Sequence, residues 1–198
     1  MKKMTRLAVA ATAAAALVLT AAPAQAHDQP RPPSGTIVDV AVAASGGGTP
    51  DQDPGDYDIL VQAVLATGLE GALADTSQTY TVFAPDDRAF LRLVTDLTGT
   101  APASETDALN TITMAFSASQ IKNILLYHVV AGKKLAPLAV LKSRSLTMAN
   151  GGMVQPRGIR LRDESPQLRD PRLVWWKTDI QAANGVIHTI DRVLVPAG

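Results

Sequence analysis

Two adjacent carboxylates, Asp86 and Asp87, stand beside Arg88 at the end of a β-favouring run, Tyr80 to Ala84. Two carboxyl groups next to a cation can form an acid–base pair or half a metal site, and they can also begin a helix. Pro85 has no N–H to offer a strand ladder and therefore ends the strand. Asp86 is then placed to cap the next helix, and Asp87 lies in its first turn, where the helix dipole favours an anion. We interpret the pair as structural, because an acid–base pair also needs a third group and a pocket.

Two histidines are the next candidates for chemistry. His128 shares a helical spacing with apolar residues, so we interpret it as a core residue with a neutral, hydrogen-bonded ring. His188 alternates with apolar residues in an expected strand and takes the same interpretation. A metal site made of both histidines and an aspartate would require the three side chains to come together in the fold, and their spacing in the sequence does not show this.

Residues 51–58 carry four carboxylates: Asp51, Asp53, Asp56 and Asp58. Calcium favours such oxygen-rich loops. The EF-hand pattern fails, however, because Gly55 stands where a ligand belongs and Gln62 where the closing glutamate belongs. We interpret the segment as a solvated acidic loop, with calcium binding as the alternative.

Two adjacent tryptophans, Trp175 and Trp176, fall in a segment that reads as a strand, 172–180. Neighbouring residues of a strand face opposite sides, so one of them can be core while the other is exposed. An exposed ring beside Lys177 and Arg172 could stack on a sugar or anchor a protein, and both rings could equally be covered.

The chain of 198 residues has a net charge of zero, but its two halves differ. Residues 36–120 hold 12 acidic side chains against Arg88 and Arg92, whereas residues 121–198 hold 12 basic and 5 acidic ones. We favour attraction between the halves within one fold over a basic face for an anionic polymer. No cysteine is present, so the fold must be stable without disulfides.

The expected domain organisation has three parts. Residues 1–26 have a basic start, an uncharged run of 16 residues and Ala24-Gln25-Ala26, the plan of a cleaved secretory signal peptide. Residues 27–35, rich in proline, are expected to be a flexible lead-in. Residues 36–196 are expected to fold as a single domain. Secretion follows, with no membrane-spanning segment in the mature chain.

The pattern of elements predicts an α+β fold, with helices in the first two-thirds and strands in the last third. Helices are expected within 59–67 and 69–73, after Asp87, and after Ser117; residues 36–44 fit a short helix or a strand. Strands are expected at 80–84, from Val129, across an Asn150-Gly151 hairpin, and in 172–180 and 185–195. Residues 98–119 and 162–171 are left as long loops without an assigned role.

Three segments, in this order, resemble the fasciclin-like domain family: YTVFAPDDRAF at 80–90, IKNILLYHVVAG at 121–132 and TDIQAANGVIHTIDRVLVP at 178–196. The resemblance implies a wedge of β-strands flanked by short helices, and a role in extracellular adhesion or matrix association, without catalysis in most members. It also implies that the Tyr127–His128 pair is structural, although this region is linked to adhesion in some members.

The resemblance further points to Asp179 and Ile180. In vertebrate matrix members an Asp-Ile pair before the NGVIH segment is implicated in integrin binding. We favour a packing role for Ile180 and a turn role for Asp179, because a dipeptide is a small motif.

We therefore predict a secreted, non-catalytic binding module. Its candidate site residues are Asp179, Ile180, Tyr127, His128 and Trp176. The partner would be an extracellular protein or a glycan, with no nucleic acid and no cofactor. One alternative is a carbohydrate-binding module that uses an exposed tryptophan and the basic late strands. The other is a hydrolase-type enzyme, against which stand the absent serine elbow, metal motif and phosphate loop.

Overall fold

The structure is a computed structural model that describes residues 35–197. The expected signal peptide, 1–26, and nearly all of the lead-in, 27–35, lie outside the described residues. The described residues all belong to one compact unit. The domain bounds 36–196 stay a prediction. Within 35–197, no helix combines the length and the apolar character needed to cross a bilayer.

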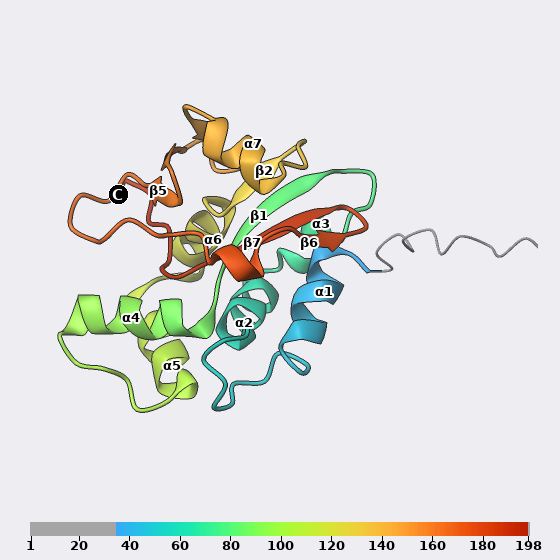
Figure 1. The fold of residues 1–198 in the computed structure, drawn as a ribbon. Helices are drawn as coiled ribbons and strands as arrows, with labels where there is room; N and C mark the ends of the chain where they lie inside the picture. The colour runs from blue at the N-terminus through green and yellow to red at the C-terminus, as the bar shows by residue number, and fades with distance from the viewer. Residues whose placement is uncertain (1–34, 198) are drawn as a thin grey trace, which may run out of the picture. The chain divides into compact units, whose positions relative to one another are not determined.

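The central sheet has four strands in the order β2-β1-β7-β6. Their bounds are β1 Tyr80–Pro85, β2 Val129–Ala131, β6 Ile180–Ala182 and β7 Gly185–Ile190. β1 and β7 pair in parallel, and β2 and β6 add antiparallel to the outer sides. The first and last of the three recognised segments thus lie side by side at the centre of the sheet (Figure 1).

Alternate residues of β1 serve two separate cores. Val82 and Ala84 pack into the larger core, together with the apolar faces of the helices on one side of the sheet. Phe83 packs on the other side, into the smaller core. Because a slip of one residue would exchange the two sets, the register of β1 is strongly specified.

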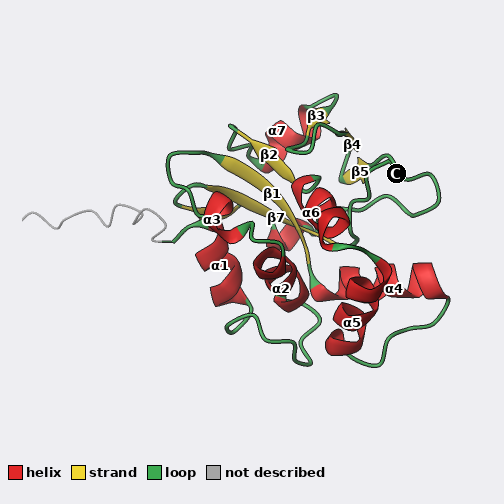
Figure 2. Cartoon of the chain, turned by 180° about the vertical axis from the view of Figure 1, so that it is seen from behind, coloured by secondary structure: helices red, strands yellow, loops and turns green. Residues whose placement is uncertain are grey.

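Six helices on the first side contribute to the larger core or to its margin (Figure 2). They are α1 Ile37–Ala44, α2 Asp58–Ala66, α3 Glu70–Leu73, α4 Asp87–Thr98, α5 Glu105–Ala115 and α6 Ala118–Leu126. On the second side lie α7 Pro137–Lys142 and a small sheet of β3 Leu146–Thr147, β4 Met153–Arg157 and β5 Arg160–Arg162. The predicted α+β class is confirmed.

Two element predictions are wrong, and the strand expected over 185–195 is too long, because β7 ends at Ile190. Residues 98–119 are not one long loop, since α5 lies within them; Ser104 caps it and Ala108 and Ile112 bury one face. The segment 172–180 is not a continuous strand either. Leu173 forms an isolated bridge with Ile190, and residues 175–177 then turn as a short 3₁₀ helix, η1 Trp175–Lys177.

Candidate functional site

His128 lies in the interior, just beyond the end of α6. Its Nδ1 is 2.7 Å from the carbonyl oxygen of Ile124, and its Nε2 accepts the amide of Leu194 at 2.9 Å. These partners fix a neutral ring with the proton on Nδ1. Burial lowers the pKa of His128 to about 4, so the ring stays uncharged near neutral pH. His128 therefore joins α6 to the C-terminal segment.

Tyr127 is also fully buried. Its hydroxyl donates to the carbonyl oxygen of Met153 at 2.8 Å. The ring lies against Gly152, where a Cβ would come within 2.6 Å of Cε2, so only glycine fits the hairpin there. In this domain neither Tyr127 nor His128 offers a side chain to a partner at the surface.

His188, on β7, positions the segment that carries Asp179. Its Nδ1 accepts the amide of Asp179 at 3.1 Å, and its Nε2 donates to the carbonyl oxygen of Leu135 at 2.8 Å. Burial lowers the pKa of His188, which favours the neutral ring that both contacts require. Because both ring nitrogens of both histidines have backbone partners, neither has a free nitrogen for a metal.

Asp179 is exposed and has a φ of 62°, in the left-handed region. Aspartate and asparagine tolerate this region better than most residues. Its Oδ1 accepts the side-chain amide of Gln181 at 2.7 Å. Ile180 follows as the first residue of β6 and is half-buried. Asp179 thus has the predicted turn role and also presents its carboxylate to solvent.

The two tryptophans lie on η1, immediately before Asp179 in the chain. Trp176 is 84% exposed and Trp175 is 52% exposed. Both rings are therefore accessible, and the expectation that they face opposite sides of a strand is wrong, because the backbone turns at this point. Lys177 fixes one side of the turn by donating to the carbonyl oxygen of Gly55 at 2.6 Å.

The pair Asp86–Asp87 is structural, with one difference from expectation. Asp86 caps α4 by accepting the amide of Ala89 at 3.0 Å, as predicted. Asp87 does more than start its own helix: its two oxygens accept the amides of Asp58 and Ile59 at 2.9 and 2.8 Å. It therefore caps α2, whose own N-cap residue provides no side-chain hydrogen bond.

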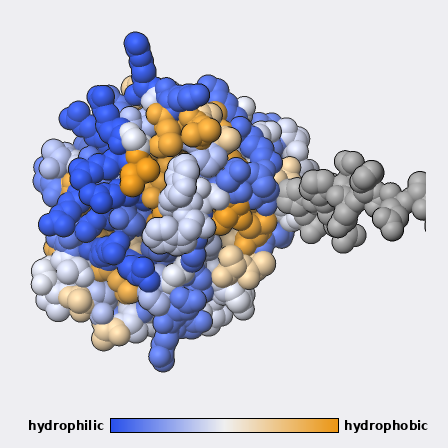
Figure 3. Space-filling view, in the orientation of Figure 1, coloured by the Kyte–Doolittle hydropathy of each residue, from blue (hydrophilic) through white to orange (hydrophobic). Residues whose placement is uncertain are grey.

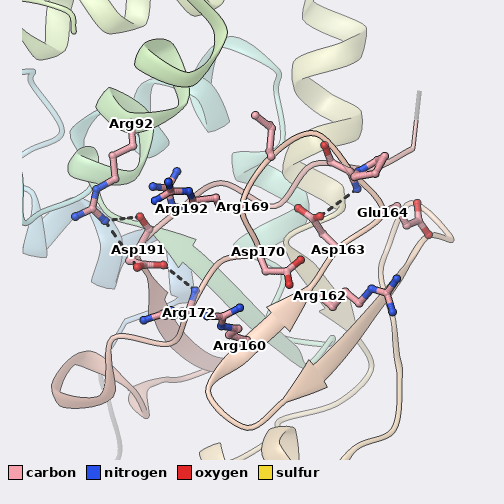
Figure 4. Close-up of a pocket in the computed structure, with 13 residues that line it drawn as sticks. Arg92, Arg160, Arg162, Asp163, Glu164, Arg169, Asp170, Arg172, Asp191 and Arg192 are labelled. Atoms are coloured by element: carbon pink, nitrogen blue, oxygen red, sulfur yellow. Dashed lines mark hydrogen bonds and ion pairs between the residues drawn. The ribbon is translucent and has the colours of Figure 1, made fainter. Parts of the chain in front are cut away.

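A groove of about 970 Å³ lies between the loop that follows β5 and the chain after β7 (Figure 4). Six arginines line it: Arg92, Arg160, Arg162, Arg169, Arg172 and Arg192. The long segment 162–171, which had no assigned role, forms much of its wall. In the view of Figure 1 this loop is at the left, and Figure 3 shows mostly hydrophilic side chains there.

Most of the acidic side chains in this groove are already engaged. Asp163 accepts the amides of Ser165 and Val195, and Glu164 those of Met153 and Ala197. Asp191 pairs with Arg92 at 3.8 Å. Among residues 35–197, no ion pair includes four of the arginines: Arg160, Arg162, Arg169 and Arg172. The groove can therefore attract an anion.

Sequence reasoning missed this groove as a site. The signal that could have found it is the surplus of basic residues after position 120, which we assigned to attraction within the fold. The groove combines β5, its loop and the residues after β7, and no spacing rule places these together.

Comparisons with known proteins agree with this architecture. The Fasciclin domain family matches residues 55–196. Protein sll1483 of Synechocystis is 31% identical over 140 residues, covering 71% of this chain and 67% of that protein. Transforming growth factor-beta-induced protein ig-h3 of Sus scrofa is 28% identical over 169 residues, which are 83% of this chain but only 20% of that protein.

Among solved structures, a FAS1 domain pair from the insect cell adhesion molecule Fasciclin I superposes with a TM-score of 0.57 at 15% identity. The match covers 82% of this chain and 51% of the insect chain. At that identity the likeness establishes the fold alone. The family match over residues 55–196 confirms the resemblance inferred from three sequence segments.

Proposed function

The chain belongs to the fasciclin domain family, and on that premise we propose that it is a secreted, non-catalytic binding module that acts in adhesion or surface association. The partner is an extracellular protein. The contact surface is residues 175–180, called the Trp–Asp segment below. Export by the signal peptide expected at 1–26 belongs to the same proposal.

One observation carries this proposal: Trp176 is 84% exposed, three residues before an exposed carboxylate at Asp179. A large exposed aromatic ring costs solubility, and such rings are common anchors of protein interfaces. The backbone beneath is held by Lys177 on one side and His188 on the other. A rigid, exposed aromatic residue beside a charge loses little conformational entropy on binding.

The test compares three variants with the mature protein for binding to immobilised matrix proteins, intact cells and glycans. Trp176→Ala removes the anchor. Asp179→Asn removes the charge but keeps a side chain that tolerates a positive φ. Met114→Ala serves as the control, because it removes an equally exposed apolar side chain (87%) on α5, outside the Trp–Asp segment.

We expect saturable binding to a protein ligand, weakened tenfold or more by Trp176→Ala, weakened by Asp179→Asn and unchanged by Met114→Ala. None of the three should change the melting temperature appreciably, because exposed substitutions usually cost within about 0.5 kcal/mol. Equal binding by all four proteins would exclude the Trp–Asp segment as the contact surface.

A second candidate function rests on the arginine groove. Four exposed arginines without ion-pair partners among the described residues favour binding of a sulfated or otherwise anionic glycan. This version of the carbohydrate-binding alternative uses the basic late segments and does not need a tryptophan.

A further inference from the structure

Five carboxylates, from three helices and one loop, meet where α2, α4 and α5 begin. Asp51 and Asp56 come from the loop before α2, Asp58 is the first residue of α2, Asp87 of α4, and Glu105 of α5. The carboxylate oxygens form two groups that share Asp56: one with Asp51 and Asp58, the other with Asp87 and Glu105. Among residues 35–197, no lysine, arginine or histidine forms an ion pair with any of the five.

Asp58 is the unusual member of this cluster. Its exposed fraction is 0%, yet neither carboxylate oxygen has a hydrogen-bond partner. The amide of Asp51 lies near this carboxylate but donates to Glu105 Oε2 at 2.8 Å. A buried carboxylate without a partner costs several kcal/mol, so it needs either a proton or a cation. The expectation of a solvated acidic loop at 51–58 is therefore wrong for Asp58.

The spacing of the first group fits one ion. In the group of Asp51, Asp56 and Asp58, one oxygen of each carboxylate lies within 4.8 Å of the others. Two ligands on opposite sides of a calcium ion, each bound at about 2.4 Å, are separated by this distance or less. All the ligand atoms are oxygens, which suits calcium rather than zinc or copper. Irregular spacing and flexible loop ligands suit calcium better than magnesium.

We propose that Asp51, Asp56 and Asp58 bind one calcium ion, with Asp87 and Glu105 behind them. The arrangement is not an EF-hand: its ligands lie on both sides of a helix start and are held by α4 and α5. The ion would neutralise the free oxygens of Asp58 and fix the loop 51–58. That loop contacts the Trp–Asp segment through Gly55 and Lys177, but the site does not depend on the proposed function.

The competing state is a cluster held by protons. Burial, together with the charges of Asp56 and Asp51, raises the pKa of Asp58 to about 6. Burial also raises the pKa of Asp87, with a hydrogen bond to Asp56 acting in the same direction. Calcium and protons would therefore compete for the same oxygens.

The experiment is calorimetric titration of the metal-free full chain with CaCl₂ and, separately, with MgCl₂ at pH 7.5, together with melting curves in EDTA and in 5 mM CaCl₂. NaCl at matched ionic strength controls for general screening. Asp58→Asn keeps the shape of the side chain and removes its charge. Asp53→Asn is the matched control in the same loop, because Asp53 belongs to neither group and Asn retains the oxygen that accepts the amide of Gly55.

We expect one calcium per chain, with a dissociation constant on the order of 10⁻⁴ M, as in extracellular calcium modules. Calcium should raise the melting temperature of the wild type and of Asp53→Asn, and Asp58→Asn should weaken binding at least tenfold. No calcium heat and no shift beyond that of NaCl would overturn the proposal. The proposal would also be overturned if Asp58→Asn raised the melting temperature and calcium had no effect on the wild type. Protons, and not an ion, would then hold the cluster together.

Discussion

At the scale of single residues, His128 shows how a side chain that can do chemistry is used for structure. The contacts of His128 require one ring nitrogen to donate a hydrogen bond and the other to accept one, and only the neutral ring does both. A protonated ring would donate from both nitrogens and lose the bond to the amide of Leu194. The pKa of His128 is about 4 in the folded protein, against about 6.5 for an unperturbed histidine.

This difference predicts a loss of stability in acid. Between pH 6.5 and 4 the unfolded state binds a proton that the folded state does not, so the free energy of unfolding falls as the pH falls. The contribution of His128 over this range is about 3 kcal/mol. Urea unfolding at pH 7 and pH 4.5 measures it, with His128→Gln as the comparison. The variant should be less stable at pH 7 and should lose less on acidification; parallel losses in both proteins would contradict the assignment.

The resemblance predicted the structural role of this residue, and the periodicity placed it near the core. Its partner, Leu194, lies 66 residues further along the chain, and no local pattern identifies such a contact. For Trp176 the pattern misled, because aromatic residues favour strands in general, while here only Leu173 pairs with β7. Its exposure became evident only once the turn at 175–177 was known.

At the scale of elements, α4 and α2 are joined by one side chain. Asp87 accepts the first two amides of α2, and Tyr57, at the N-cap position, makes no side-chain bond to the helix. Asp86 serves only its own helix, α4. The sequence identified the strand-to-helix turn at 85–87 from proline and aspartate chemistry. It did not reveal the second role of Asp87, because the amides concerned come 28 and 29 residues earlier.

We predict that Asp87→Ala destabilises the domain by about 2–4 kcal/mol, since it leaves two buried amides without acceptors. Asp86→Ala should cost about 1 kcal/mol, the ordinary value for a lost helix cap. Chemical denaturation of both variants beside the wild type measures the difference. Equal costs for the two substitutions would mean that Asp87 acts only within α4.

At the scale of the whole domain, charge is distributed unevenly. The acidic half of the sequence builds the carboxylate cluster at the starts of α2, α4 and α5, and the basic half supplies four arginines of the groove that make no ion pair in residues 35–197. The two ion pairs among residues 35–197 do join the halves, Arg92 with Asp191 and Arg192 with Asp96. Attraction between the halves therefore accounts for part of the surplus of basic residues. The four groove arginines carry positive charge that no ion pair within the fold neutralises.

That unused charge predicts salt-dependent binding of an anionic polysaccharide. Heparin should bind the wild type, and the logarithm of its binding constant should fall linearly with the logarithm of salt concentration, by about one unit of slope for each charge contact. Changing Arg160, Arg162 and Arg169 together to glutamine should lower the slope by up to about three. The matched control changes three exposed cations elsewhere to glutamine, Lys122, Lys142 and Arg144, and leaves the net charge equal. If the groove binds heparin, the groove variant should lose affinity and salt slope, while the control variant should keep both. If the two variants lose them equally, binding follows net charge and the groove has no special role.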